Sequence, residues 1–247
     1  MNDELLEWYA AHRRDLPWRR MTDPYAILVS EVMLQQTQVA RVIPRYEAWL
    51  ARWPTAAALA QAPVADVLSA WVGLGYNRRA LRLREACAVV AAQGWPRDLT
   101  ELPGVGAYTA AALGAFAFGR DSVALDTNVR RLFARFGRAL EPRAGEGPLF
   151  NQATIELGAL VCRARAPRCD ACPLEPRCSW DGDVPVQRAP AVRFEDTDRW
   201  VRGRVVAALA AGEELPAIDA ARLERALAAL ERDGLVQRDG AAVRLPA

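Results

Sequence analysis

The sequence predicts a mainly α-helical protein with a small α/β tail, and three observations support this fold class. Alanine- and leucine-rich segments with helical periodicity fill residues 1–160, interrupted by proline and glycine, and no alternating strand pattern occurs among them. Four cysteines then cluster within residues 162–178. Residues 198–247 contain two amphipathic segments and end in a hairpin signal. We therefore expect a helical body, a cysteine-rich loop and a separate C-terminal unit.

The composition is that of an ordinary globular protein. Of 247 residues, 52% are hydrophobic, which is ample for a buried core. No apolar run is long enough to cross a bilayer, and residues 1–4 lack the pattern of a secretory signal, so we expect a cytoplasmic protein without a membrane partner. The chain contains no lysine, which excludes any mechanism that needs a side-chain amine as a Schiff-base nucleophile.

The net charge is a weak guide to the partner. The formal charge is only +2, so bulk electrostatics does not by itself indicate a nucleic-acid binder. The arginines, however, cluster within 13–20, 78–84 and 130–138. Such clusters occur on solvated helix faces as well as on DNA-binding surfaces, and charge alone leaves both interpretations open.

Four cysteines form a candidate metal site. Cys162, Cys169, Cys172 and Cys178 follow the spacing C-x6-C-x2-C-x5-C, which is too tight for disulfides in a cytoplasmic protein and suits one metal centre. Four thiolates bind either zinc or an iron–sulfur cluster, and the ligand type does not choose between them. The spacing resembles that of the 4Fe-4S loop of the endonuclease III family of DNA glycosylases, which favours the cluster. Cys87, isolated on an apolar helix face, is expected to be a packed core thiol.

A glycine-rich turn precedes the helix that starts near Ala107. It contains Leu102, Gly104, Val105 and Gly106. Backbone N–H groups at such a helix N-terminus can approach a phosphate without obstruction by side chains. Taken alone, the pattern is equally typical of a simple tight turn.

Asp126 is positioned to cap a helix that runs to Gly137. A capping carboxylate is held rigid at a helix N-terminus, which suits an electrostatic catalyst, so the structural and catalytic roles are compatible. Together with the glycine-rich turn before it, Asp126 resembles the catalytic aspartate of the helix-hairpin-helix glycosylase superfamily, with that motif at about residues 99–115. The resemblance also implies a monovalent cation at this motif.

Glu31 is the most informative carboxylate by physical argument. Asp23 and Pro24 are typical of a helix start, and Tyr25–Leu34 is apolar on nearly every face. A glutamate within such a segment is desolvated, which raises its pKa and keeps a proton available near neutral pH. An exposed or salt-bridged side chain is the ordinary alternative for this residue type.

The string Ser-Glu-Val-Met-Leu-Gln-Gln-Thr-Gln-Val at 30–39 favours the catalytic interpretation of Glu31. Together with Leu-Pro-Trp-Arg at 16–19 and Gly-Leu-Gly-Tyr at 73–76, it resembles the signature of the MutY family of adenine DNA glycosylases. The resemblance runs from about Trp8 to Trp180. It implies base-excision repair of double-stranded DNA in which adenine is mispaired with 8-oxoguanine or guanine, by an enzyme that we expect to be a monomer.

The resemblance implies a role for each matching residue. Family enzymes flip the target nucleotide out of the duplex. Glu31 then protonates adenine N7, Asp126 stabilises the oxocarbenium-like sugar, and Asn128 supports the acid or the catalytic water through hydrogen bonds. Tyr108 stands where lyase-type relatives carry a lysine, so we expect a monofunctional enzyme that leaves an abasic site. The matching DNA contacts are a base-pocket wall of Arg14, Leu16, Trp18 and Arg19 and a wedge in the vacated stack of Gln36, Thr37, Leu74 and Tyr76.

The resemblance also implies a division of the matching region into an N-terminal helix within 1–20 that packs with the cluster domain, a six-helix barrel at 21–130 and the iron–sulfur domain at 131–182. The composition after it predicts a linker at 183–197. The order helix, helix, hairpin then predicts a winged-helix-like tail at 198–247, with a helical tail and an incidental hairpin as the alternative.

The tail departs from the better-known members of the family. Helices at 202–210 and 220–231 precede strands at 235–238 and 242–245, joined around an Asp-Gly pair. This unit is too short and too helical for the Nudix-like domain of many members, and it resembles the tail of shorter, actinobacterial-type members. The strength of discrimination in favour of 8-oxoguanine is therefore left open.

Two other functions compete with adenine excision. The first is a mismatch thymine or uracil glycosylase on the same scaffold, which would have no use for Glu31 because N7 protonation is a purine device. The second is an iron–sulfur redox regulator that reads DNA through the tail. A regulator has no task for the pair of Glu31 and Asp126, so the adenine glycosylase is the preferred function.

Overall fold

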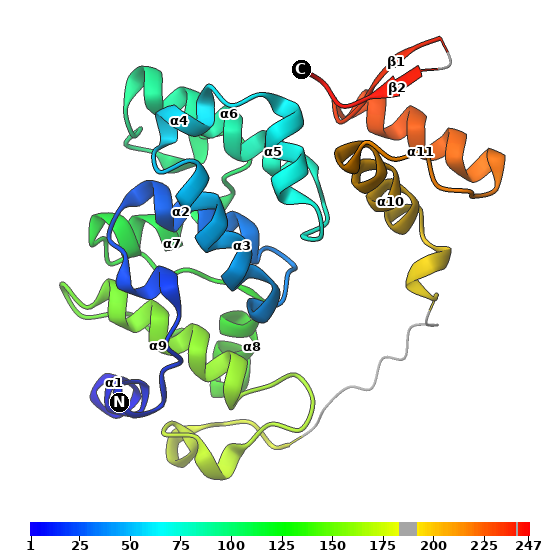
Figure 1. Cartoon of the computed structure of the whole chain (residues 1–247). Helices are drawn as coiled ribbons and strands as arrows, with labels where there is room; N and C mark the ends of the chain where they lie inside the picture. Colours follow the sequence, from blue (N-terminus) through cyan, green and yellow to red (C-terminus); the bar gives the residue numbers. More distant parts are fainter. Residues whose placement is uncertain (183–191, 241) are drawn as a thin grey trace. The chain divides into compact units, whose positions relative to one another are not determined.

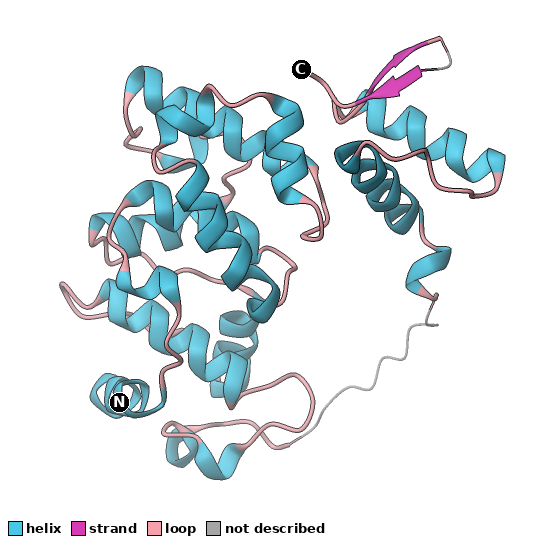
Figure 2. Ribbon diagram, in the orientation of Figure 1, coloured by secondary structure: helices cyan, strands magenta, loops and turns pink. Residues whose placement is uncertain are grey.

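The computed structural model describes residues 1–182, 192–240 and 242–247. Helices make up most of this described chain, and the strands within it form one C-terminal hairpin (Figure 2). The mainly helical class predicted from the sequence is therefore confirmed. The chain divides into two compact units, one of Met1–Glu31, Asp98–Glu101 and Val105–Arg188, and the other of Val32–Arg97, Leu102–Gly104 and Ala189–Ala247.

The first unit is built around helix α9. Both α1 and α8 pack against α9 (Figure 1), and Leu5, Leu132 and Phe150 from the three helices are buried together. The approach of α8 to α9 requires a glycine, since a Cβ at Gly158 would lie 2.9 Å from the Cβ of Asn128. The elements of this unit are α1 (Asn2–His12), η1 (Pro17–Arg20), the start of α2 (Pro24–Leu34), η2 (Leu99–Glu101), α7 (Ala107–Phe118), α8 (Thr127–Phe136), α9 (Gly147–Leu160), η3 (Cys169–Ala171) and η4 (Glu175–Arg177).

The helical part of the second unit packs around aromatic side chains. Trp49 meets Trp53 and Trp71 edge-on, with ring centroids 4.7 Å and 5.4 Å away. Such edge-to-face pairs add to the stability that apolar burial supplies. The helices here are α3 (Val39–Arg52), α4 (Ala56–Ala60), α5 (Val64–Trp71) and α6 (Arg78–Gln93), with α4 and α5 packed on α6.

The tail also belongs to the second unit and contains two helices followed by a hairpin. After η5 (Phe194–Asp196), α10 spans Asp198–Ala211, α11 spans Ala220–Arg232, and strands β1 (Gln237–Asp239) and β2 (Ala242–Arg244) pair antiparallel. Helix α10 begins before the predicted residue 202 because the Thr197 side chain caps it, accepting from the Trp200 N–H. Helix α10 packs on both α11 and α5.

Two details of the predicted tail need correction or restriction. The sequence predicts Asp239 in the hairpin loop, but this residue lies in β1 and pairs with Ala242. The left-handed conformation that the loop requires is instead adopted by Gly240, with φ +59°. Of the predicted linker 183–197, residues 183–191 lie outside the described residues.

Candidate active site

Glu31 lies toward the C-terminal end of helix α2, in a stretch that is buried on every face. Asp23 caps α2 by accepting from the Ala26 N–H at 3.0 Å, and Pro24 occupies the first turn, as the sequence predicts. Every residue from Tyr25 to Met33 is buried, and the Glu31 side chain is only 6% exposed. The exposed alternative for Glu31 is therefore wrong, and the side chains that shift its pKa are a tyrosine and a second carboxylate rather than an arginine.

The surroundings of Glu31 hold its carboxyl partly protonated at neutral pH. Burial raises the pKa of Glu31 most strongly, and the charge of Asp126 raises it further, while a hydrogen bond from Tyr108 opposes the rise. The resulting pKa is about 7, compared with the ordinary 4.5. Burial and the two carboxylates also raise the pKa of Tyr108 well above its ordinary value, so its hydroxyl stays protonated and donates to Glu31.

Asp126 is held by two donors at the start of α8. Its side chain caps the helix, accepting from the Val129 N–H at 2.6 Å and from the Asn128 amide at 2.9 Å. The helix ends at Gly137, which has φ +87°. These bounds confirm the predicted helix, and they leave the Asp126 carboxylate fixed rather than free to rotate.

A chain of hydrogen bonds leads from Asp126 to the cysteine-rich loop. The Asn128 amide that donates to Asp126 also accepts from the Arg131 guanidinium at 2.8 Å. Arg131 in turn donates to the backbone carbonyls of Gly158, at 2.7 Å, and Cys162, at 2.8 Å. The position of Asp126 is thus linked to the position of the first cysteine of the cluster motif.

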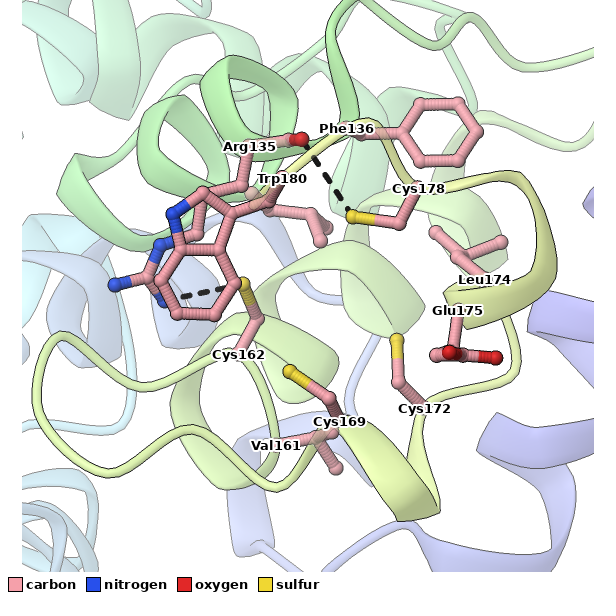
Figure 3. Close-up of a pocket in the computed structure, with 11 residues that line it drawn as sticks. Arg135, Phe136, Val161, Cys162, Cys169, Cys172, Leu174, Glu175, Cys178 and Trp180 are labelled. Carbon is pink, nitrogen blue, oxygen red and sulfur yellow. Dashed lines mark hydrogen bonds between the residues drawn. The ribbon is translucent and has the colours of Figure 1, made fainter. Parts of the chain in front are cut away.

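The four cysteines of the predicted metal site line one pocket. Figure 3 shows their sulfurs around a common space, with Leu174 and Phe136 on the wall. Arg135 donates to the Cys162 sulfur at 3.6 Å and is covered by the ring of Trp180 at 4.1 Å. Within the described part of the chain, no group of three or more histidine, cysteine or acidic side chains is arranged to hold a single metal ion. Cys87 is fully buried and its pKa rises to about 12 by burial, so the predicted core thiol is confirmed.

Arg14 and Arg19, predicted to line the base pocket, share one buried carboxylate. Glu156 of α9 is fully buried and accepts from both guanidiniums at 2.6–3.1 Å, and from the Arg14 backbone N–H at 2.8 Å. Burial would raise the pKa of Glu156, but these hydrogen bonds outweigh it and hold the pKa at about 2. Leu16 and Trp18 between the two arginines are buried. Sequence reasoning missed Glu156, because its partners are more than 130 residues away.

The predicted wedge residues stand on two loops of the second unit. Gln36 and Tyr76 are exposed and both adopt left-handed backbone conformations, with φ +55° and +48°. Leu74 is buried, and its carbonyl accepts from the Thr37 hydroxyl at 3.3 Å. Of this set, Gln36 and Tyr76 therefore present the most accessible side chains.

One arginine ties these two loops together. Arg79 donates to the carbonyls of Val32, Met33 and Gln35 on one side and of Leu74 and Gly75 on the other, at 2.6–3.2 Å. Burial lowers the pKa of Arg79 to about 10, so it remains charged at neutral pH. Neither periodicity nor a motif marks Arg79 in the sequence, since its partners come from two separate turns.

The glycine-rich turn contains one glycine that its backbone requires. Gly104 has φ +78°, and a Cβ there would lie 2.7 Å from the Cβ of Arg82. Gly106 has neither constraint, but it is the N-cap of α7 and as glycine offers no side-chain acceptor to the first N–H groups of that helix. Leu102 and Val105 are buried on either side of Gly104.

In the parts of the chain that the structure describes, no helix is both long and apolar enough to span a membrane.

Comparison with solved structures supports the fold. A thermostable thymine-DNA glycosylase superposes with a TM-score of 0.67 and 28% identity, covering 72% of this chain and 93% of that one. A trapped endonuclease III–DNA complex superposes with a TM-score of 0.62 at 24% identity, covering 72% of this chain and 92% of that one. The chain thus has the helix-hairpin-helix glycosylase fold predicted from the sequence.

Comparison with characterised relatives identifies the family. The adenine DNA glycosylase of Mycolicibacterium smegmatis is 44% identical across 95% of this chain and 92% of its own length. That of Mycobacterium tuberculosis is 45% identical across 95% and 89%. The human adenine DNA glycosylase is 40% identical over 70% of this chain, which is 38% of the human protein. Residues 29–146 also match the family described as HhH-GPD superfamily base excision DNA repair protein. The chain therefore belongs to the adenine DNA glycosylase family of base-excision repair enzymes.

Proposed function

We propose that the protein hydrolyses the N-glycosidic bond of adenine mispaired with 8-oxoguanine or guanine in double-stranded DNA. The observation that carries this proposal is the buried carboxyl of Glu31, whose pKa of about 7 makes it a proton donor at neutral pH. A purine leaves more readily once its N7 is protonated, so a partly protonated acid in a dry site serves purine excision.

The two carboxyl groups take separate roles. Glu31 delivers its proton to adenine N7 and weakens the bond to the sugar. Asp126, fixed by the donors at the start of α8, stabilises the positive charge that develops on the sugar. Asn128 positions Asp126, and Tyr108 orients Glu31 through its hydrogen bond.

The product is an abasic site rather than a broken strand. Opening the sugar by a Schiff base needs an amine, and the chain has no lysine. The hydroxyl of Tyr108 stays protonated and is not a nucleophile at neutral pH. Water is therefore the nucleophile that adds to the sugar cation, and the enzyme is monofunctional.

The adenine must leave the duplex to reach Glu31, and the exposed loops supply the means. Gln36 and Tyr76 enter the space that the flipped base leaves. The hydrogen bond from Thr37 to the carbonyl of the buried Leu74 joins the two loops that carry them. Leu16 and Trp18 contribute the apolar wall of the adenine pocket, and Arg14 and Arg19 hold that wall in place through Glu156. The N–H groups at the start of α7 bind a backbone phosphate, next to the predicted monovalent cation.

A 4Fe-4S cluster is the metal centre that best fits the four cysteines. Four thiolates can hold either zinc or a cluster, and the four cysteines line one pocket. The resemblance of their spacing to that of the endonuclease III family favours the cluster, to which each cysteine would supply one thiolate ligand. When bound, the cluster closes the loop 162–178 into a fixed shape.

The domain division predicted from the sequence, including the winged-helix-like tail, forms part of this proposal.

Incubation with a set of duplexes tests the proposed substrate. The protein is mixed with duplexes that contain A opposite 8-oxoguanine, A opposite G, T opposite G and U opposite G, and cleavage is measured with and without alkali. We expect alkali-dependent cleavage at adenine only. Release of thymine or uracil would instead support the rival thymine or uracil glycosylase activity. That activity is tested because a structure of similar fold is a thymine-DNA glycosylase. Cleavage without alkali would contradict the monofunctional mechanism.

A further inference from the structure

Tyr76 projects from a loop whose backbone carbonyls are held by hydrogen bonds from neighbouring side chains. Its own φ of +48° is unusual for an aromatic residue, and the preceding Gly73 and Gly75 also have positive φ. Arg79 binds the Leu74 and Gly75 carbonyls, and the Trp71 indole donates to the Gly75 carbonyl at 3.1 Å. The backbone therefore presents the Tyr76 side chain at the surface, where it remains 39% exposed.

The tail reaches this side chain through Arg199, in the first turn of α10. The Arg199 guanidinium donates to the Tyr76 hydroxyl at 2.6 Å and lies 4.8 Å from the centre of its ring. It also lies 4.9 Å from the centre of the Phe194 ring in η5. Arg199 thus engages both the face and the hydroxyl of Tyr76, which fixes the side-chain rotamer more tightly than either contact alone.

Further contacts hold the tail against the same part of the chain. Asp233, just after α11, accepts from Arg78, two residues after Tyr76, at 3.5 Å, and also from Arg202 of α10. Helix α10 packs on α5, the helix that precedes the Tyr76 loop, and buries Val201 and Val205. The position of Arg199 is therefore set by a packed helix rather than by a single ion pair.

We infer that Arg199 is a positioning residue for Tyr76, and that the tail thereby takes part in recognition of the mispair. This inference rests on the proposed role of Tyr76 as a wedge. An exposed tyrosine samples several rotamers, and insertion into a base stack would require it to lose that freedom on binding. Arg199 removes the freedom beforehand, so its effect appears only in complexes where the wedge is inserted.

The test measures affinity with an uncleavable substrate. Wild type and variants are titrated at fixed salt with a duplex carrying 2′-fluoro-2′-deoxyadenosine opposite 8-oxoguanine, and with a fully paired duplex of the same length. For Arg199→Ala we expect about tenfold weaker binding to the mispair, the loss typical of one hydrogen bond and one exposed cation–π contact. Binding to the paired duplex should change much less.

Two further variants separate positioning from charge. Arg204→Ala removes the same charge from an exposed position of α10 and should weaken both duplexes alike, as a loss of phosphate attraction does. Arg199→Lys keeps the charge but lacks the planar fork, and it should resemble Arg199→Ala on the mispair. A uniform loss for Arg199→Ala, or full rescue by Arg199→Lys, would overturn the inference in favour of simple electrostatic attraction.

The Tyr76→Leu background tests whether Arg199 acts through Tyr76. There, Arg199→Ala should cause no further loss of mispair affinity, whereas an additive loss would contradict the inference. In the free protein, the Arg199 Nε–H resonance should shift when Tyr76 is replaced, because the ring current is lost; an unchanged resonance would show that the contact is not formed. These readouts do not require excision, so a wild-type protein that fails to release adenine would refute the proposed function separately.

Discussion

Replacing Glu31 by glutamine should remove activity and at the same time stabilise the fold. Glutamine keeps the shape of the side chain and can still accept from Tyr108, but it cannot deliver a proton. Loss of a general acid typically lowers the rate by about two to four powers of ten. Binding to a mispaired duplex should remain, since the flipped base meets a side chain of the same size.

The stability change follows from the raised pKa of Glu31. Because the pKa is about 7 in the folded protein and near 4.5 in the unfolded chain, the folded state keeps a proton that the unfolded state has lost between these values. The wild-type fold is therefore penalised progressively as the pH rises from 4.5 to 7, by up to about 3 kcal/mol at about 1.4 kcal/mol per pKa unit. Glu31→Gln has no such penalty, so its advantage should be full at pH 8 and absent at pH 4.

Two assays check these expectations. Urea unfolding of wild type and Glu31→Gln across pH 4 to 8 gives the difference in the free energy of unfolding, from which other titrating groups cancel. Single-turnover excision by the wild type should fall about tenfold per pH unit above pH 7, as the acid loses its proton. The exposed Glu47→Gln variant of α3 is the matched control and should change neither quantity. A wild-type rate that rises from pH 7 to 8, or a variant that is less stable at pH 8, would refute the reasoning.

Three other predictions follow from the site. Asp126→Asn should lower the single-turnover rate about 10²–10³-fold with little change in melting temperature, because asparagine caps helices as well as aspartate does; a rate near that of the wild type would reduce Asp126 to a cap. Arg79→Lys should destabilise the protein by about 2–4 kcal/mol in urea unfolding, since an ammonium has too few donors for the two loops; a change below 1 kcal/mol would contradict the clamp. Protein purified without oxygen should be brown, with iron and sulfide in near-equal amounts, whereas stoichiometric zinc in a colourless, fully active preparation would exclude the cluster.

The sequence predicted those parts of the site that depend on local signals. The start of α2 and both ends of α8 follow from capping residues and glycine, which act within a few residues of where they stand. The burial of Glu31 could be predicted because its helix is apolar on nearly every face, whatever it packs against. The direction of its pKa shift then follows from burial, which is the largest of the causes.

The sequence could not predict contacts between distant segments. Glu156 is one charged residue in an apolar helix, as Glu31 is, yet two arginines hold its pKa near 2 while Glu31 is left near 7. Only the fold tells which buried glutamate is paired. The contact of Arg199 with Tyr76 likewise joins residues 123 positions apart, and the tail arginines carry no motif that would point to it.

Gln36 and Tyr76, the two exposed side chains of the proposed wedge, share a strained backbone conformation that Arg79 holds in place. Gln36 and Tyr76 each occupy a left-handed conformation that costs a non-glycine residue about 1–2 kcal/mol. Arg79 offsets that strain with hydrogen bonds to the carbonyls around both residues, even though burial of its charge is itself unfavourable, as its lowered pKa shows. A loop pair fixed in this way loses its conformational entropy during folding. In the proposed wedge role, the loop pair then loses no further backbone entropy on entering the base stack, where the cost of unstacking must already be met.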